Sequence, residues 1–164
     1  MLIDLLTREE EAIDRRTGHI RFDIHLLAHR LLGVIAWLKA QPDTSMLPIG
    51  LFGASTGGGA ALVAAALRPF DIAAVVSRGG RPDLAGAELT QVIAPTLLIV
   101  GGLDAPVIAM NRHAMSQIPG NVRLEIVEGA THLFEEPGAL ERVATLAGNW
   151  FAMYFEEAHD SRVA

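Results

Sequence analysis

Three residues of this chain have the types that nucleophilic catalysis requires, and they occur in the order serine, aspartate, histidine. Ser55 lies in the glycine-rich run 53–59, which reads Gly-Ala-Ser-Thr-Gly-Gly-Gly. Asp104 and His132 each follow a short apolar run further along the chain. A serine hydroxyl is a weak nucleophile until a base takes its proton, and a histidine base works best when a carboxylate orients its ring. We therefore predict that Ser55 attacks an acyl group, with His132 as the base and Asp104 as the group that holds the imidazole tautomer and stabilises its cation.

The surroundings of Ser55 fit a nucleophile. An apolar run enters the Gly-x-Ser-x-Gly pattern and an alanine-rich stretch leaves it, as in the strand-turn-helix called a nucleophile elbow. The sharp turn forces the serine into a strained backbone conformation. Gly53 and Gly57 carry no side chain, so we expect the strand and the helix to approach closely there. Unpaired N–H groups at a helix N-terminus can stabilise an oxyanion, and the N–H of Thr56 is the expected first donor.

Short apolar runs alternate with helical patterns, which is typical of a mostly parallel sheet with helices on both faces. About five strands are predicted, at residues 2–6, 48–53, 72–77, 96–101 and 122–127. Asp104 and His132 follow the last two of these runs. Because ligands of such sheets bind outside the carboxyl ends of the strands, we expect both side chains beside the elbow.

The helices are predicted between these strands. They span residues 22–40 with Asp23 as a candidate N-cap, 55–67, 105–117, and a segment from Pro137 onward. The charged residues 7–19 are expected to form a loop, and the tail 156–164 is expected to be frayed. The chain shows no internal repeat, so residues 1–164 are predicted to form a single α/β domain.

The composition restricts the class of protein. Of the 164 residues, 51% are hydrophobic, but no apolar run approaches the roughly 18 residues of a membrane span. The formal net charge is -6, which argues against nucleic acid as a partner. Cysteine is absent, which excludes disulfides and thiolate metal sites. The N-terminus has neither a basic region nor a cleavage site, so we expect a cytoplasmic protein. We expect no membrane association and no cofactor.

Each of the three candidate catalytic residues also has a structural interpretation when it is taken alone. A Gly-x-Ser-x-Gly pattern can be an ordinary turn, and Asp104 can be the N-cap of the helix that follows it. His132 can be a loop histidine with a structural hydrogen bond. Taken together, the order serine, aspartate, histidine and the placement of all three residues at strand ends favour catalysis.

Other candidate sites are weaker. His25 and His29 lie four apart on one helix face, but the glutamate of a zinc-binding helix is missing between them, so we expect no metal site. The glycines 57–59 are not followed by the lysine of a phosphate-binding loop. Arg78 and Arg81 flank two glycines after the third predicted strand, where they form either a solvated loop or a substrate-binding carboxylate clamp.

Nearly the whole chain resembles the dienelactone hydrolase-like branch of the α/β-hydrolase superfamily, in particular small hydrolases that occur alone or fused to phosphoribosyltransferase domains. The resemblance is carried by residues 2–7, 22–24, 48–59, 76–84, 95–104 and 129–135. It implies that Ser55, Asp104 and His132 form a catalytic triad. It also implies a substrate among esters, lactones and related acyl compounds.

The chain departs from that family at its front. Family members of this kind carry a further segment before the strand that matches residues 2–6, and a loop of that segment gives the second oxyanion N–H. We therefore expect a truncated α/β-hydrolase fold in which the elbow strand 48–53 becomes an edge. The strand 2–6 could move beside it, a separate chain could complete the sheet, or two copies could pair or exchange the N-terminal arm 1–21. We favour the homodimer.

These observations predict a serine hydrolase, specifically a carboxylesterase that cleaves small, short-acyl esters or lactones through an acyl-enzyme. The small domain leaves little room for a lid, so an open site is expected. The alternative is a catalytically weak or inactive hydrolase-like module that binds a ligand or assembles with a partner. Acyl transfer to an acceptor other than water uses the same triad and is equally compatible with the sequence.

Overall fold

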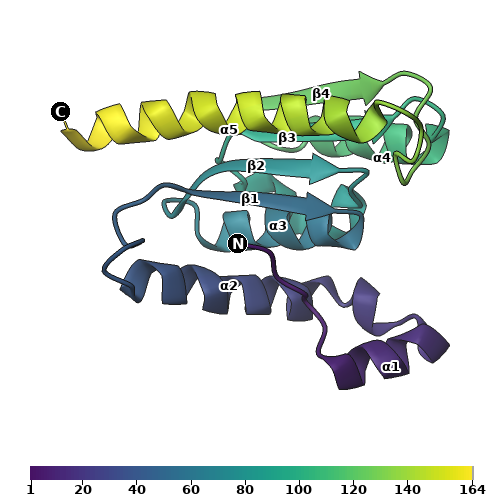
Figure 1. Ribbon diagram of the computed structural model, residues 1–164, viewed down its shortest axis with the longest axis horizontal. Coiled ribbons are helices and arrows are strands. Elements are labelled where there is room, and N and C mark those ends of the chain that lie inside the picture. The colour runs from purple at the N-terminus through teal and green to yellow at the C-terminus, as the bar shows by residue number, and fades with distance from the viewer. Residues whose placement is uncertain (164) are drawn as a thin grey trace.

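The computed structural model describes residues 1–163, with side chains through residue 158, and contains a parallel sheet between two layers of helices (Figure 1). The strands are β1 (Ile49–Ala54), β2 (Ile72–Arg78), β3 (Thr96–Gly101) and β4 (Val122–Val127), in the spatial order β1-β2-β3-β4. One side carries α2 (Ile24–Ala40), α3 (Thr56–Leu67) and α4 (Ala105–Met115), and the other carries α5 (Ala139–Val163). The predicted α/β architecture is confirmed.

The burial of the strands explains why the sheet needs helices on both faces. All six residues of β3 are buried, as is typical of a strand covered on both sides. On one face the core includes Leu62 and Val63 of α3, and on the other it includes Trp150 of α5. The small side chains of α3 let this helix lie close to the sheet. The helix begins at Thr56, so its N-terminus lies at the end of β1.

The N-terminal residues 2–6 do not form the strand that their apolar character predicted. They have no regular secondary structure and do not pair with the sheet, and Leu2 is 101% exposed. Leu5 and Leu6 pack against the core, and the guanidinium of Arg30 on α2 donates a hydrogen bond to the carbonyl of Leu5. A short apolar run alone does not make a strand, because a strand also requires a neighbouring strand with which to pair.

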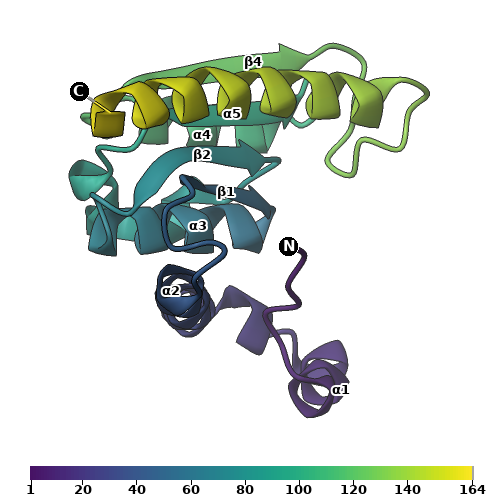
Figure 2. The ribbon, with the colours of Figure 1, turned by 60° about the vertical axis from the view of Figure 1, so that its left-hand side comes forward.

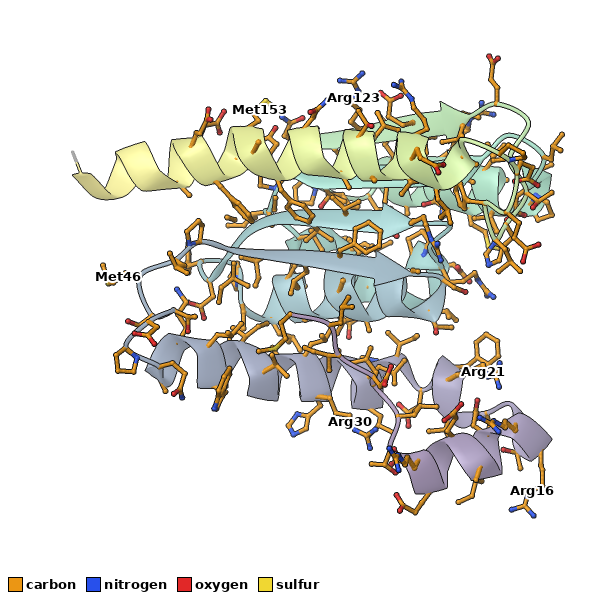
Figure 3. All side chains as sticks on the ribbon, in the orientation of Figure 1. Arg16, Arg21, Arg30, Met46, Arg123 and Met153 are labelled. Carbon is orange, nitrogen blue, oxygen red and sulfur yellow. The ribbon has the colours of Figure 1, made fainter. Side chains whose placement is uncertain are left out.

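The charged residues 7–19, expected to be a loop, contain the helix α1 (Arg8–Thr17) and lead into η1 (Ile20–Phe22). Thr7 and Glu10 form a capping box, in which each side chain accepts a hydrogen bond from the backbone N–H of the other. Figure 2 shows α1 projecting beyond α2, away from the sheet. Arg30 of α2 lies toward α1 (Figure 3) and pairs with Glu10.

The other helices lie close to their predicted ranges. Asp23 caps α2 by accepting a hydrogen bond from the N–H of Leu26, as predicted. The segment η2 (Pro82–Gln91), which consists of two short 3-10 helices joined by a kink at Gly86, was not anticipated. The tail from residue 156, expected to be frayed, continues α5 through Val163, and residue 164 lies outside the described residues.

Candidate active site

Ser55 occupies the turn between β1 and α3 in a backbone conformation that side chains rarely adopt. Its φ is 51° and its ψ is -121°, which costs on the order of 1–3 kcal/mol and persists only where surrounding contacts impose it. The N–H of Ser55 donates to the carbonyl of Arg78, 3.0 Å away. Its carbonyl accepts from the N–H groups of Gly58 at 3.0 Å and Arg81 at 3.1 Å. These contacts hold the strained serine at the carboxyl end of the sheet.

The glycines of the elbow differ in what they permit. A Cβ on Gly53 would lie 2.2 Å from the carbonyl oxygen of Gly57, so only glycine allows the strand to pass the helix here. A Cβ on Gly59 would lie 2.8 Å from the carbonyl oxygen of Arg81. A Cβ on Gly57 would meet nothing within 4 Å. The expectation of close approach is therefore correct for Gly53 and wrong for Gly57.

Asp104 and His132 form a direct side-chain pair at the same end of the sheet. Nδ1 of His132 lies 2.7 Å from Oδ2 of Asp104. The carboxylate is 14% exposed and the imidazole 38% exposed, so the pair is sheltered on one side and accessible on the other. The Asp104 side chain makes no hydrogen bond to the N-terminus of α4, so it holds the histidine instead of capping the helix. Leu103 also donates its N–H to the carbonyl of Ala130, which joins the two loops.

The loop after β2 connects the serine to the histidine. Gly79 has a φ of +51°, and a Cβ built on it would lie 3.3 Å from the carbonyl oxygen of His132 and 3.5 Å from its ring atoms Cε1 and Nδ1. The preceding residue, Arg78, receives the hydrogen bond from the N–H of Ser55. Among the described residues, no hydrogen bond joins Ser55 to His132. Catalytic hydrogen bonds are often long or poorly aligned without substrate.

The backbone of the His132 loop is held by a buried side chain and by hydrogen bonds within the loop. Phe134 is fully buried with a φ of 58°, and its N–H donates to the carbonyl of Thr131. Oε1 of Glu136 accepts the N–H of Thr131 at 3.1 Å. Hydrogen bonding with Thr131 lowers the pKa of the Glu136 carboxyl. These contacts set the backbone that presents His132.

Arg78 and Arg81, expected to form either a solvated loop or a carboxylate clamp, contact different partners. The guanidinium of Arg81 makes two hydrogen bonds to Asp83, at 2.8 and 2.7 Å, and this pairing raises the pKa of Arg81. The guanidinium of Arg78 lies 5.6 Å from the ring centroid of Phe134, within the range of a cation–π contact. Only Arg78 thus keeps its charge near the His132 loop without an ion-pair partner among the described side chains.

Asn111 is a buried polar residue near the candidate site that was not anticipated. It is fully buried on α4, and its Nδ2 donates to the carbonyls of Gly80 at 3.1 Å and Val107 at 2.8 Å. The first of these bonds fixes the turn that packs against His132. The available signal was a polar residue on the apolar face of a predicted helix, between Val107 and Ala114.

Metal-ligating clusters and membrane-spanning helices were both looked for in the part of the chain that the structure describes. That part contains no group of three or more His, Asp or Glu side chains able to hold a metal ion. His25, one of the two histidines considered above as metal ligands, instead has Nε2 3.7 Å from a carboxylate oxygen of Glu88. Within the same residues, every helix is too short or too polar to cross a membrane.

The sheet, its covering helices and the strained serine at the strand-to-helix turn define the α/β-hydrolase class. The sequence model of the dienelactone hydrolase family matches residues 4–158. The chain belongs to the dienelactone hydrolase family.

Two solved structures and a curated protein are similar to this chain. The dienelactone hydrolase of Anabaena variabilis is 65% identical, with a TM-score of 0.90, and the match covers 94% of this chain and 71% of that one. A protein of Thermoplasma acidophilum described as a predicted CIB-like hydrolase is 27% identical, with a TM-score of 0.60, and the match covers 77% and 59%. A Mycobacterium tuberculosis protein named as a phosphoribosyl transferase is 61% identical over 151 residues, which are 92% of this chain and 33% of that protein. The chain thus spans about a third of the curated relatives that it matches.

Proposed function

We propose that this protein hydrolyses small carboxylic esters or lactones through a Ser55–His132–Asp104 triad. The observation that carries the proposal is the 2.7 Å contact between Nδ1 of His132 and Oδ2 of Asp104, beside the strained serine. Because Nδ1 donates to the carboxylate, Nε2 is the ring atom left to accept the serine proton.

The reaction has two halves. Oγ of Ser55 bonds to the ester carbonyl carbon while its proton passes to Nε2 of His132. The carbonyl then re-forms, the bond to the leaving oxygen breaks, and the alcohol departs with the proton from His132. A water molecule next gives a proton to His132 and bonds to the carbonyl carbon of the acyl-enzyme. The bond between that carbon and Oγ of Ser55 then breaks, His132 returns its proton to Oγ, and the carboxylic acid leaves. Asp104 stays ionised and stabilises the imidazolium in both halves.

The N–H of Thr56 is the proposed oxyanion donor. Thr56 is the first residue of α3, so its N–H lies at the positive end of the helix dipole. The partial exposure of His132 supports an open site suited to short acyl groups. Arg78 is the basic side chain placed to attract an acidic substrate, since Arg81 is already paired.

The proposal is tested with a fluorophosphonate probe and with p-nitrophenyl acetate. The wild-type chain should react stoichiometrically at Ser55 and hydrolyse the ester, whereas Ser55→Ala should lose both activities. Ser116→Ala, which changes an exposed serine at the end of α4, is the matched control and should retain both. Ester hydrolysis that survives Ser55→Ala unchanged would refute the assignment.

A second candidate function is a hydrolase-like module with little turnover, acting in binding or assembly. The observation that favours it is the edge position of β1, the strand that carries Ser55. An enzyme that lacks one oxyanion donor loses on the order of 3 kcal/mol of transition-state stabilisation, roughly a hundredfold in rate. A well-folded chain that does not react with the fluorophosphonate probe would support this second function.

A further inference from the structure

The loop that leaves β2 lies between the strand that leads to Ser55 and the strand that leads to Asp104. In the sheet, β2 is the neighbour of both β1 and β3 (Figure 1). Arg78 ends β2 and pairs with a residue of each of these two strands. We call residues 78–81 the β2 loop. From this position the loop can contact both the nucleophile and the groups that serve it.

The β2 loop holds both backbone groups of Ser55. The carbonyl of Arg78, at one end of the loop, accepts the N–H of Ser55 at 3.0 Å. The N–H of Arg81, at the other end, donates to the carbonyl of Ser55 at 3.1 Å. A strained backbone persists only where surrounding contacts impose it, so these two bonds help to keep Ser55 at its φ of 51°. A displacement of the β2 loop would therefore move the serine.

The middle of the β2 loop packs against His132. Gly79 is buried, and a Cβ built on it would lie 3.3 Å from the carbonyl oxygen of His132, which is closer than most contacts of real Cβ atoms. The same Cβ would lie 3.5 Å from Cε1 and Nδ1 of the imidazole, in van der Waals contact with the ring. The φ of +51° at Gly79 also disfavours every residue that has a Cβ. Glycine therefore lets the loop approach the histidine as closely as it does.

Both sides of this contact are anchored. The N–H of Gly79 donates to the carbonyl of Ile99 on β3 at 2.7 Å, which ties the β2 loop to the sheet. On the other side, Nδ1 of His132 lies 2.7 Å from the carboxylate of Asp104. A methyl group on residue 79 must therefore shift either His132 or the β2 loop. The first shift moves the base and the second moves the nucleophile, so either one changes the geometry between the serine hydroxyl and Nε2.

We propose that Gly79 is a positioning residue, which sets the placement of Oγ of Ser55 relative to Nε2 of His132 because it puts no side chain between the β2 loop and the imidazole. This role rests on the proposed triad. Among the described residues no hydrogen bond joins Ser55 to His132, so their relative placement depends on the backbone that carries them. A misplacement of 1 Å can cost about a hundredfold in rate. A shift of a few tenths of an ångström, which the 3.3 Å contact would require, should cost on the order of tenfold.

The kinetics of p-nitrophenyl acetate hydrolysis test the role of Gly79. Gly79→Ala should lower kcat by about tenfold with a smaller change in KM, because the displaced groups act in the chemical step. Gly86→Ala is the matched control, since Gly86 has a similar φ of +55° but its Cβ would meet only Oε2 of Glu88, at 3.8 Å. Both variants force alanine into a left-handed backbone and should lower Tm, yet Gly86→Ala should keep the wild-type kcat. An equal kcat in the two variants would overturn the proposal.

Gly79→Asn separates the contact with His132 from the backbone strain. Asparagine adopts the left-handed conformation more readily than alanine does, so Gly79→Asn should have a higher Tm than Gly79→Ala. Its Cβ occupies the same place against His132, so kcat should stay low. A kcat that recovers together with Tm would show that the backbone strain alone lowers the rate, and would overturn the proposal.

A measurement without substrate distinguishes a failure of this proposal from a failure of the proposed function. The proton on Cε1 of His132 gives an NMR signal, which is assigned by its loss in His132→Gln. Gly79→Ala should shift this signal, because the added Cβ lies 3.5 Å from Cε1, whereas Gly86→Ala should leave it in place. A wild-type chain that does not hydrolyse the ester would refute the proposed function. An unmoved His132 signal in Gly79→Ala would instead overturn the positioning role of Gly79.

Discussion

Nδ1 of His132 lies 2.7 Å from Oδ2 of Asp104, and the two residues reach this distance from loops that follow neighbouring parallel strands. β3 and β4 end level with each other, with Gly101 paired to Val127. A Cβ on Gly101 would lie 2.5 Å from the carbonyl oxygens of the His132 loop, so the two loops pack with no side chain between them. The strand register and this close packing create the acid–base pair.

The Asp104–His132 contact should control the rate more than the fold. Asp104→Asn preserves the shape of the side chain but favours the wrong imidazole tautomer, so kcat for p-nitrophenyl acetate should fall by about 10⁴. Asp83→Asn is the control at the start of η2, where the aspartate pairs with Arg81, and kcat should change little. Comparable losses in both variants would show that Asp104 has no special role.

Because the backbone of Ser55 is strained, glycine at this position should give a more stable protein than alanine, the reverse of the usual order. Ser55→Gly relieves the φ of 51°, so its free energy of unfolding should exceed that of Ser55→Ala by about 1–3 kcal/mol. At Ser116, where φ is -73°, the same comparison should reverse, with glycine less stable than alanine by about 0.5–1 kcal/mol. Urea unfolding of the four variants measures both differences. Glycine and alanine of equal stability at position 55 would show that the turn is unstrained.

The elbow glycines should respond oppositely to alanine. Gly53→Ala places a methyl group 2.2 Å from the Gly57 carbonyl oxygen, and such overpacking typically costs about 1–3 kcal/mol. Gly57→Ala meets open space, and alanine is favoured over glycine inside a helix by up to about 1 kcal/mol. Thermal and urea unfolding should therefore show destabilisation for the first variant only. Equal effects would disprove the close approach at Gly53.

Asn111 should act as a positioning residue through the turn at Gly80. Asn111→Ala leaves the buried Gly80 carbonyl without its donor, which should lower the free energy of unfolding by about 1–3 kcal/mol. Because that turn packs against His132, the variant should also lower kcat with a smaller change in KM. Arg112→Ala, on the exposed neighbouring position, should change stability by less than about 0.5 kcal/mol. A loss of stability with unchanged kcat would limit Asn111 to a structural role.

The attachment of α1 should weaken in acid. Hydrogen bonds from Arg30, then from the Thr7 backbone, lower the pKa of Glu10 from 4.5 to about 2. A carboxyl whose pKa is depressed by folding stabilises the fold fully above its unfolded pKa, and that stability is lost as the pH falls from about 4.5 toward 2. The free energy of unfolding of the wild type should therefore fall more steeply over this window than that of Glu10→Gln. Glu9→Gln, on the adjacent exposed position, should follow the wild type.

The helix α1 shows where prediction from the sequence was incomplete. Its charged residues suggested a loop, although Thr7 and Glu10 have the spacing of a capping box. The buried carboxylate of Asp14 adds a tertiary reason for the helix. Burial raises the pKa of Asp14, but hydrogen bonds from Arg21 and Ile20 outweigh burial and leave that pKa below its ordinary value. The capping box could have been recognised from the sequence, whereas the Asp14 contacts depend on the fold of η1.

The sequence by itself determined the parallel α/β fold, the elbow at Ser55 and the placement of Asp104 and His132 at one end of the sheet. It could do so because apolar periodicity and the order of the elements along the chain are visible in the sequence, and because parallel strands bring their carboxyl ends together. Only the tertiary structure decided that residues 2–6 stay unpaired and that Arg81 pairs with Asp83. It also decided that Asn111 anchors the turn beside His132. These outcomes depend on which groups meet across the fold, and a strand or an ion pair forms only where a partner lies within reach.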